Sequence, residues 1–172
     1  QVMAGFGASI TDASAWLIQT KLTPAARKAL LTELFSTRHG IGFSVTRIPI
    51  AASDFSQSHY SYADKPGRPD ADVSPARAHR IPTLKAMRAI NPGLQIIATP
   101  WSAPAWMKES GSLIKGRLKP DHYPDFAKYL VSYSNAMKRA GVRINLLTIQ
   151  NEPHFEPGDY PGMRMEPRER AA

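Results

Sequence analysis

IPTLKAMRAINPGLQIIA, residues 81–98, predicts a helix, a stop signal and a strand in immediate succession. The helix is expected over residues 81–90, and the Asn-Pro-Gly run that follows ends it, because proline and glycine interrupt helical backbone. Residues 94–98 then form a short apolar strand with two isoleucines. A helix that leads directly into such a strand indicates a repeating unit of strands and helices.

The same order is found on the N-terminal side of this stretch. Residues 6–8 predict a weak first strand, and the pair Thr23-Pro24 opens a helix, with threonine as the cap and proline at the first helical position. Gly40 is expected to stop this helix. A second strand is expected over residues 43–48, and Pro49 is expected to halt it.

The order continues on the C-terminal side. A third helix is expected over residues 124–140 and a fourth strand over residues 146–150. Glu166-Pro167 looks like the start of a fourth helix. A polar loop over residues 51–75 is long enough to indicate a functional role.

Four strands separated by helices predict a parallel α/β sheet, because each strand must cross over through a helix before it pairs again. A doubly wound sheet is the weaker candidate, since residues 5–9, GFGAS, lack the third glycine and the immediate helix of a phosphate-binding loop. The favoured fold is a (β/α)₈ TIM barrel, of which residues 1–172 hold only the first four βα units. A whole barrel has about 250 residues.

Composition is that of one globular domain: 42% of the 172 residues are apolar and 21% are charged. The net charge is +8, but the 22 Lys and Arg residues are scattered, so we expect no nucleic-acid partner. No stretch approaches the length of an apolar membrane span, so no integral membrane association is expected. The absence of cysteine excludes disulfides.

Polar side chains gather where the expected strands end. Asp12 follows the first strand, Arg47 ends the second and Trp101 follows the third, while Asn151 and Glu152 follow the fourth. In a TIM barrel this face carries the active site. Four separate strands therefore indicate one site.

Glu152 is the main catalytic candidate. Pro153 is expected to hold Glu152 in extended geometry at the rim, and the adjacent apolar strand is expected to give it the partly dry environment that suits a general acid/base. The alternative is a turn glutamate that hydrogen-bonds to local backbone.

The other candidates have alternatives as well. Trp101 and Trp106 suit stacking against sugar rings, or ordinary core packing. Asp12 could instead cap a short helix over residues 13–16. Arg47 is interpreted as a buried arginine that needs carboxylate partners.

Five blocks, in this order along the chain, resemble glycoside hydrolase family 30, the family of glucosylceramidase. They are residues 5–13, 46–56, 60–64, 99–108 and 150–153. The resemblance implies a (β/α)₈ barrel, usually with a small β-sandwich, that hydrolyses β-glycosides with retention of configuration. It also implies secretion or another location outside the cytoplasm.

The resemblance gives roles to the candidate residues. Glu152 takes the role of general acid/base and Asn151 binds the sugar 2-hydroxyl, Asp12 and Trp101 contact the sugar, and Arg47 supports the catalytic carboxylates. The favoured substrate is a β-glucoside, as in glucosylceramidases. A β-1,6-glucan or a β-xyloside is the alternative, and so is a sugar-binding relic without chemistry.

In the family the nucleophile lies on the seventh strand, which these residues do not include. Glu156, Asp159 and Glu166 do not match its motif. We therefore expect this chain to be inactive alone, to lack the β-sandwich and to need the C-terminal half of the barrel as its partner. No cofactor is expected, and the histidines show no metal-ligand spacing.

Overall fold

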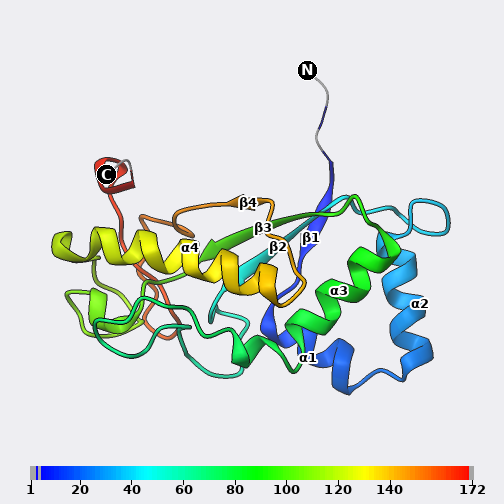
Figure 1. Cartoon of the computed structure of the whole chain (residues 1–172), viewed down its shortest axis with the longest axis horizontal. Helices are drawn as coiled ribbons and strands as arrows, with labels where there is room; N and C mark the ends of the chain where they lie inside the picture. The colour runs from blue at the N-terminus through cyan, green and yellow to red at the C-terminus, as the bar shows by residue number, and fades with distance from the viewer. Residues whose placement is uncertain (1–2, 4, 171–172) are drawn as a thin grey trace.

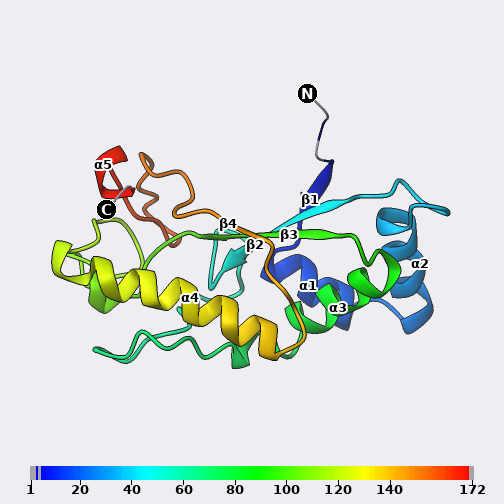
Figure 2. The ribbon, with the colours of Figure 1, turned by 45° about the horizontal axis from the view of Figure 1, so that its top comes forward.

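The computed structural model describes residue 3 and residues 5–170, and it contains a four-stranded parallel sheet in the order β1-β2-β3-β4. The strands are β1 (Gly7–Ser9), β2 (Val45–Ile50), β3 (Gln95–Pro100) and β4 (Leu146–Leu147). The helices are α1 (Asp12–Thr20), α2 (Pro24–Phe35), α3 (Arg80–Ile90), α4 (Tyr123–Arg139) and α5 (Pro167–Arg170). Helices α1 to α4 lie on one side of the sheet (Figure 1, Figure 2). The four expected βα units are confirmed.

Strand β2 has the expected length but lies two residues further along the chain, so Pro49 lies inside it and not beyond its end. The Arg47 carbonyl faces β1 and accepts a hydrogen bond from the Ile10 N–H (2.9 Å). Residues two apart in a strand face the same neighbour, so Pro49 also faces the β1 side, beyond the last residue of β1. The N–H that proline lacks is therefore not needed for pairing.

Other boundaries also differ from the expected ones. Strand β1 is shifted by one residue, and β4 pairs over two residues and not five, because it has a partner on one side alone among the described residues. Helix α2 ends at Phe35 with Ser36 as its cap, so Gly40 is not its stop. The short helix considered after Asp12 extends to Thr20.

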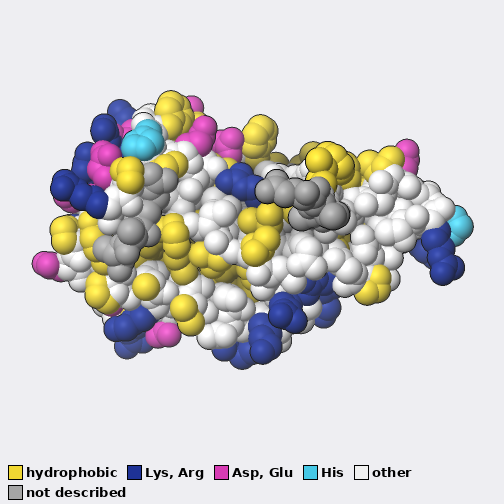
Figure 3. Space-filling model, turned by 90° about the horizontal axis from the view of Figure 1, so that it is seen from above, with side chains coloured by type: hydrophobic (Ala, Val, Ile, Leu, Met, Phe, Trp, Pro, Cys, Tyr) yellow, Lys and Arg dark blue, Asp and Glu magenta, His cyan; other side chains and the backbone are white. Residues whose placement is uncertain are grey.

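The core lies between the sheet and the helices. On α4 the apolar residues that recur at helical spacing are buried, namely Phe126, Tyr129, Leu130, Tyr133 and Met137. The face seen from above shows hydrophobic side chains over much of its middle (Figure 3). Phe6, Leu146, Ile149 and Phe155 are among the exposed apolar residues. Within the described ranges, no helix has the length and apolar character needed to span a membrane.

Candidate active site

The side chains of Arg47, Trp101 and Asn151 meet beside the C-terminal ends of the strands. Trp101 directly follows β3 and Asn151 follows β4, but Arg47 lies inside β2 and does not end it as expected, because the strand continues to Ile50. The Arg47 Nη2 donates a hydrogen bond to Asn151 Oδ1 (2.6 Å), and its Nε donates to Thr99 Oγ1 (3.2 Å). The guanidinium carbon lies 4.7 Å from the centre of the Trp101 ring. Trp101 is buried, with 8% of its surface exposed. The parallel sheet therefore brings together residues from three strands, as expected.

The interactions of Arg47 differ from the expected carboxylate pairs. Its hydrogen bonds go to an amide and a hydroxyl, while Glu152 and Asp54 act on it through longer-range attraction. Burial lowers the pKa of Arg47, and the two carboxylates oppose this effect. Arg47 is only half-buried, so its charge keeps some contact with solvent and does not require a directly paired carboxylate.

Glu152 does not have the expected backbone or surroundings. Its φ is 40°, in the left-handed region, and its carbonyl accepts a hydrogen bond from the Phe155 N–H (2.9 Å), so a turn replaces the extended geometry. The residue is exposed, and the partly dry environment is not found. Its side chain accepts a hydrogen bond from Asn151 Nδ2 at Oε2 (3.1 Å). Left-handed backbone at a residue other than glycine is strained and concentrates at functional sites.

A shallow recess lies beside Glu152. Trp101, Asn151 and Tyr160 also line it. Burial raises the pKa of Tyr160, and the carboxylates of Glu152 and Asp54 raise it further. Tyr160 and Asp54 were not predicted as site residues from the sequence. Asp54 lies in residues 46–56, one of the blocks that resemble the family, so this resemblance could have identified it.

Asp12 lies in a different network. It pairs with buried Arg80 through Oδ1, and its Oδ2 accepts hydrogen bonds from Tyr60 Oη (2.7 Å) and Ser56 Oγ (3.0 Å). Thr11, and not Asp12, caps α1. Both carboxylate oxygens of Asp12 are thus occupied by protein donors.

Trp106 lies away from the cluster of Arg47, Trp101 and Asn151. Its Nε1 donates a hydrogen bond to the Ala63 carbonyl (2.8 Å), and its ring packs edge-on against His122 at 5.1 Å. The indole is half-buried against the core. Its placement matches the core-packing alternative.

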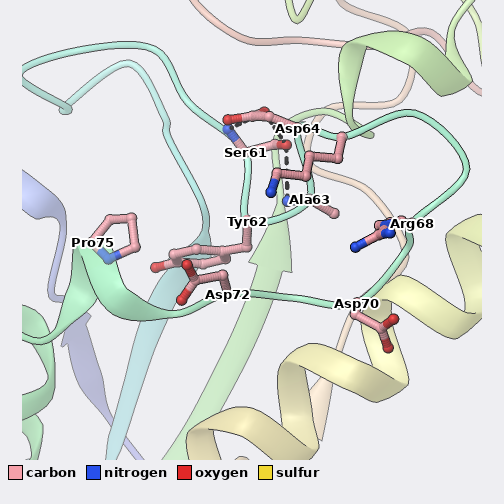
Figure 4. A pocket seen from close by; sticks show the side chains of 9 residues that line it. Ser61, Tyr62, Ala63, Asp64, Arg68, Asp70, Asp72 and Pro75 are labelled. Carbon is pink, nitrogen blue, oxygen red and sulfur yellow. Dashed lines mark hydrogen bonds between the residues drawn. The ribbon is translucent and has the colours of Figure 1, made fainter.

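The long loop of residues 51–75 forms a pocket of its own. Ser61, Tyr62, Asp64, Arg68 and Asp72 are among its lining residues (Figure 4). Ser61 Oγ donates a hydrogen bond to Asp64 Oδ1 (2.5 Å), which fixes the turn. None of the candidate residues named from the sequence lines this pocket.

A parallel sheet whose strands lie side by side in chain order, with polar side chains beyond their C-terminal ends, is the arrangement found in TIM barrels. The family model of the glycosyl hydrolase family 30 TIM-barrel domain matches residues 3–165, and the chain belongs to this family. Its four strands form the N-terminal half of the barrel.

Relatives include both glucanases and a glucosylceramidase. The chain is 37% identical to an endo-1,6-beta-D-glucanase of Neurospora crassa over 95% of its own length and 36% of the relative's. It is 32% identical to the lysosomal acid glucosylceramidase of Mus musculus, over 89% of this chain and 31% of that protein. A solved endo-beta1,6-glucanase superposes with a TM-score of 0.92 at 40% identity, over 99% of this chain and 39% of that one. The chain thus spans about a third of the length of these proteins.

Proposed function

We propose that this chain supplies the acid/base half of a retaining β-glucoside hydrolase, with Glu152 as the general acid/base. The observation that carries the proposal is the contact between Glu152 and Asn151 at the end of β4, beside Arg47 and Trp101. A carboxyl group next to an amide donor and an aromatic ring suits a sugar, because the ring stacks on its C–H face while polar groups bind its hydroxyls.

The proposed reaction needs two carboxyl groups about 5 to 5.5 Å apart. Glu152 donates a proton to the leaving oxygen, and the second carboxylate attacks the anomeric carbon to form a glycosyl-enzyme. Glu152 then removes a proton from the water that hydrolyses this intermediate. We propose that a later strand supplies the attacking carboxylate, as the family resemblance implies.

The proposed substrate is a β-1,6-linked glucan, with a glucosylceramide-type β-glucoside as the second choice. The relatives named as endo-1,6-glucanases support this order, since identity to the Neurospora crassa protein is 37% and to the mouse glucosylceramidase 32%. A polymeric substrate also favours a location outside the cytoplasm. The preferred substrate is therefore a β-1,6-glucan and not the glucosylceramide-type β-glucoside that the motifs alone favoured.

We propose sugar contacts for Trp101 and Asn151, with Arg47 as their support. Asp12 and Trp106 are proposed to act indirectly, because their polar atoms are already bound to protein groups. A sugar-binding role without chemistry is the second proposed function, favoured by the preformed contacts of Arg47 with Trp101 and Asn151. Titration with glucose or an iminosugar tests it.

The test of hydrolysis uses the chain alone and the chain joined to the remaining barrel strands. The 172-residue chain is expected to be inactive, and the joined chain is expected to release reducing ends from β-1,6-glucan. Glu152→Gln should lower kcat/KM by about 10²- to 10⁴-fold, the usual contribution of a general acid/base. Glu33→Gln, the same change at an exposed residue of α2, is the matched control.

Two results would contradict these expectations. Turnover of an aryl β-glucoside by the 172-residue chain, lost in Glu152→Gln, would show that the chain alone is active. Full activity of Glu152→Gln in the joined chain would remove the acid/base role.

A further inference from the structure

Lys108 is a fully buried lysine beside the proposed site. It follows the short 3-10 helix Ala105–Met107, and none of its surface is exposed. Its Nζ donates hydrogen bonds to Ser102 Oγ (2.9 Å), the Leu113 carbonyl (3.0 Å) and the Gly162 carbonyl (2.9 Å). An ammonium group has three donors, so these three acceptors match its full capacity.

The three acceptors belong to different segments around the site. Ser102 follows Trp101 at the end of β3, and Leu113 lies in the loop between β3 and α4. Gly162 lies in the loop that follows β4, which also carries Asn151 and Glu152. A single side chain therefore joins the segment of Trp101 to the loop of Glu152.

The buried side chain of Gln150 binds the same loop at Met163, the residue after Gly162. Gln150 Nε2 donates to the Trp101 carbonyl (2.7 Å) and, over 3.2 Å, to the Met163 carbonyl. The consecutive carbonyls of Gly162 and Met163 are thus held by side chains from the segments that follow β3 and β4. The returning part of the loop is attached to both segments.

The loop itself folds back tightly. The Met165 N–H donates to the Pro153 carbonyl (2.8 Å), and the Gly162 N–H donates to the Leu113 carbonyl (3.0 Å). A Cβ at Gly162 would lie 2.3 Å from the Pro157 ring, so this approach requires glycine. Movement of Gly162 is therefore transmitted to the outgoing part of the loop.

We propose that Lys108 is a positioning residue for Glu152, which it holds in place through the Gly162 carbonyl and the returning part of the loop after β4. Glu152 itself is exposed and its side chain contacts Asn151, so its position depends on the loop that carries it. Ser102 and Leu113 accept the other two hydrogen bonds of Lys108 and so attach its ammonium group to the segment that follows β3. This inference rests on the proposed acid/base role of Glu152.

The three hydrogen bonds of Lys108 require its protonated form, which burial makes less favourable. Burial lowers the pKa of Lys108 to about 7, and the carboxylate of Glu156 opposes the shift. A neutral amine has two N–H donors and cannot serve all three acceptors. The protonated side chain is therefore the form that holds the three segments together.

The first experiment measures amide hydrogen exchange in Lys108→Met, which shortens the unbranched side chain by one atom and removes its donors. We expect exchange in residues 157–165 to become about tenfold faster or more, because local opening becomes easier, while α2 and α3 keep their protection. Lys115→Met is the matched control, since Lys115 is exposed in the loop between β3 and α4. Unchanged exchange in residues 157–165, or a uniform loss that includes α2 and α3, would overturn the proposal.

If Lys108→Met does not fold, a less disruptive variant tests the same connection. Ser102→Ala removes one acceptor and should accelerate exchange in the same residues by a smaller factor, with α2 and α3 again unchanged. No acceleration in residues 157–165 would count against the connection. Neither measurement depends on turnover, so a negative result here leaves the proposed hydrolase function untouched.

The second experiment measures turnover with two leaving groups in the chain joined to the remaining barrel strands. A displaced Glu152 should lower kcat/KM by about tenfold or more for an alkyl β-glucoside, which needs its proton, because small displacements of catalytic groups have large effects. For a dinitrophenyl β-glucoside, whose leaving group needs no proton, the change should stay below about threefold. Equal losses for both substrates would indicate a merely structural role and overturn the proposal.

Discussion

Arg47 Nη2 lies 2.6 Å from Asn151 Oδ1, a contact between residues 104 positions apart in the sequence. The bond fixes the Asn151 amide so that its Nδ2 is directed to Glu152 Oε2 (3.1 Å). A continuous line of hydrogen bonds thus runs from Arg47 inside β2 to the carboxyl group of Glu152 after β4. The geometry of the acid/base candidate depends on a residue from another strand.

Arg47→Lys should weaken this line, because an ammonium group lacks the planar fork that contacts Asn151 and stacks on Trp101. We expect kcat/KM for β-1,6-glucan to fall by roughly tenfold to a hundredfold in the joined chain. Steady-state kinetics check the prediction. Arg77→Lys, at an exposed position, is the control, and wild-type kinetics for Arg47→Lys would refute the argument.

Asp12→Asn should act on stability, because it leaves the buried Arg80 guanidinium without its carboxylate. The free energy of unfolding should fall by about 3 kcal/mol, as expected for a broken buried ion pair. Urea denaturation measures this change. Asp70→Asn, at an exposed carboxylate, should have little effect, and an equally small effect of Asp12→Asn would contradict the structural role.

Trp101→Phe and Trp106→Phe should separate the two tryptophans. Trp106→Phe loses the hydrogen bond to the Ala63 carbonyl, so unfolding should become easier by about 1 kcal/mol with sugar affinity unchanged. Trp101→Phe should weaken binding of an iminosugar, because it reduces the stacking surface beside Arg47. Calorimetric titration and thermal unfolding of both variants provide the comparison. Weaker iminosugar binding in Trp106→Phe, with unchanged binding in Trp101→Phe, would contradict this assignment of the two tryptophans.

Lys108 should give the stability of the chain a distinct pH dependence. Its pKa is lowered from 10.5 to about 7 in the folded chain, so between these values the unfolded chain binds the proton that the folded chain releases. Stability should therefore rise with pH across this window, by at most about 1.4 kcal/mol per pH unit. Urea unfolding at several pH values tests this slope.

The matched variants isolate the contribution of Lys108 from that of other titrating groups. Lys108→Met should lose this part of the slope, while Lys115→Met should keep it. A slope that is identical in Lys108→Met and in the original chain would show that Lys108 does not titrate in this range.

Much of the fold was predictable because its signals are local. The apolar spacing in residues 124–140 and the break after residue 90 depend on neighbours along the chain, and both helices were found. The meeting of Arg47, Trp101 and Asn151 was also predictable, because the C-terminal ends of parallel strands lie at one edge of a sheet. The role of Pro49 was missed, since it depends on where the neighbouring strand ends.

By itself the sequence determined the order of strands and helices, the family and the strand ends at which the polar residues gather. The tertiary structure decided which of these polar groups are already bound to other protein groups. Asp12 is paired with Arg80, 68 residues away, while Asp54 acts on Arg47 together with Glu152. It also buried Lys108 among three carbonyl and hydroxyl acceptors. No local pattern encodes such pairs, because the energy of a charge depends on which distant groups replace its water.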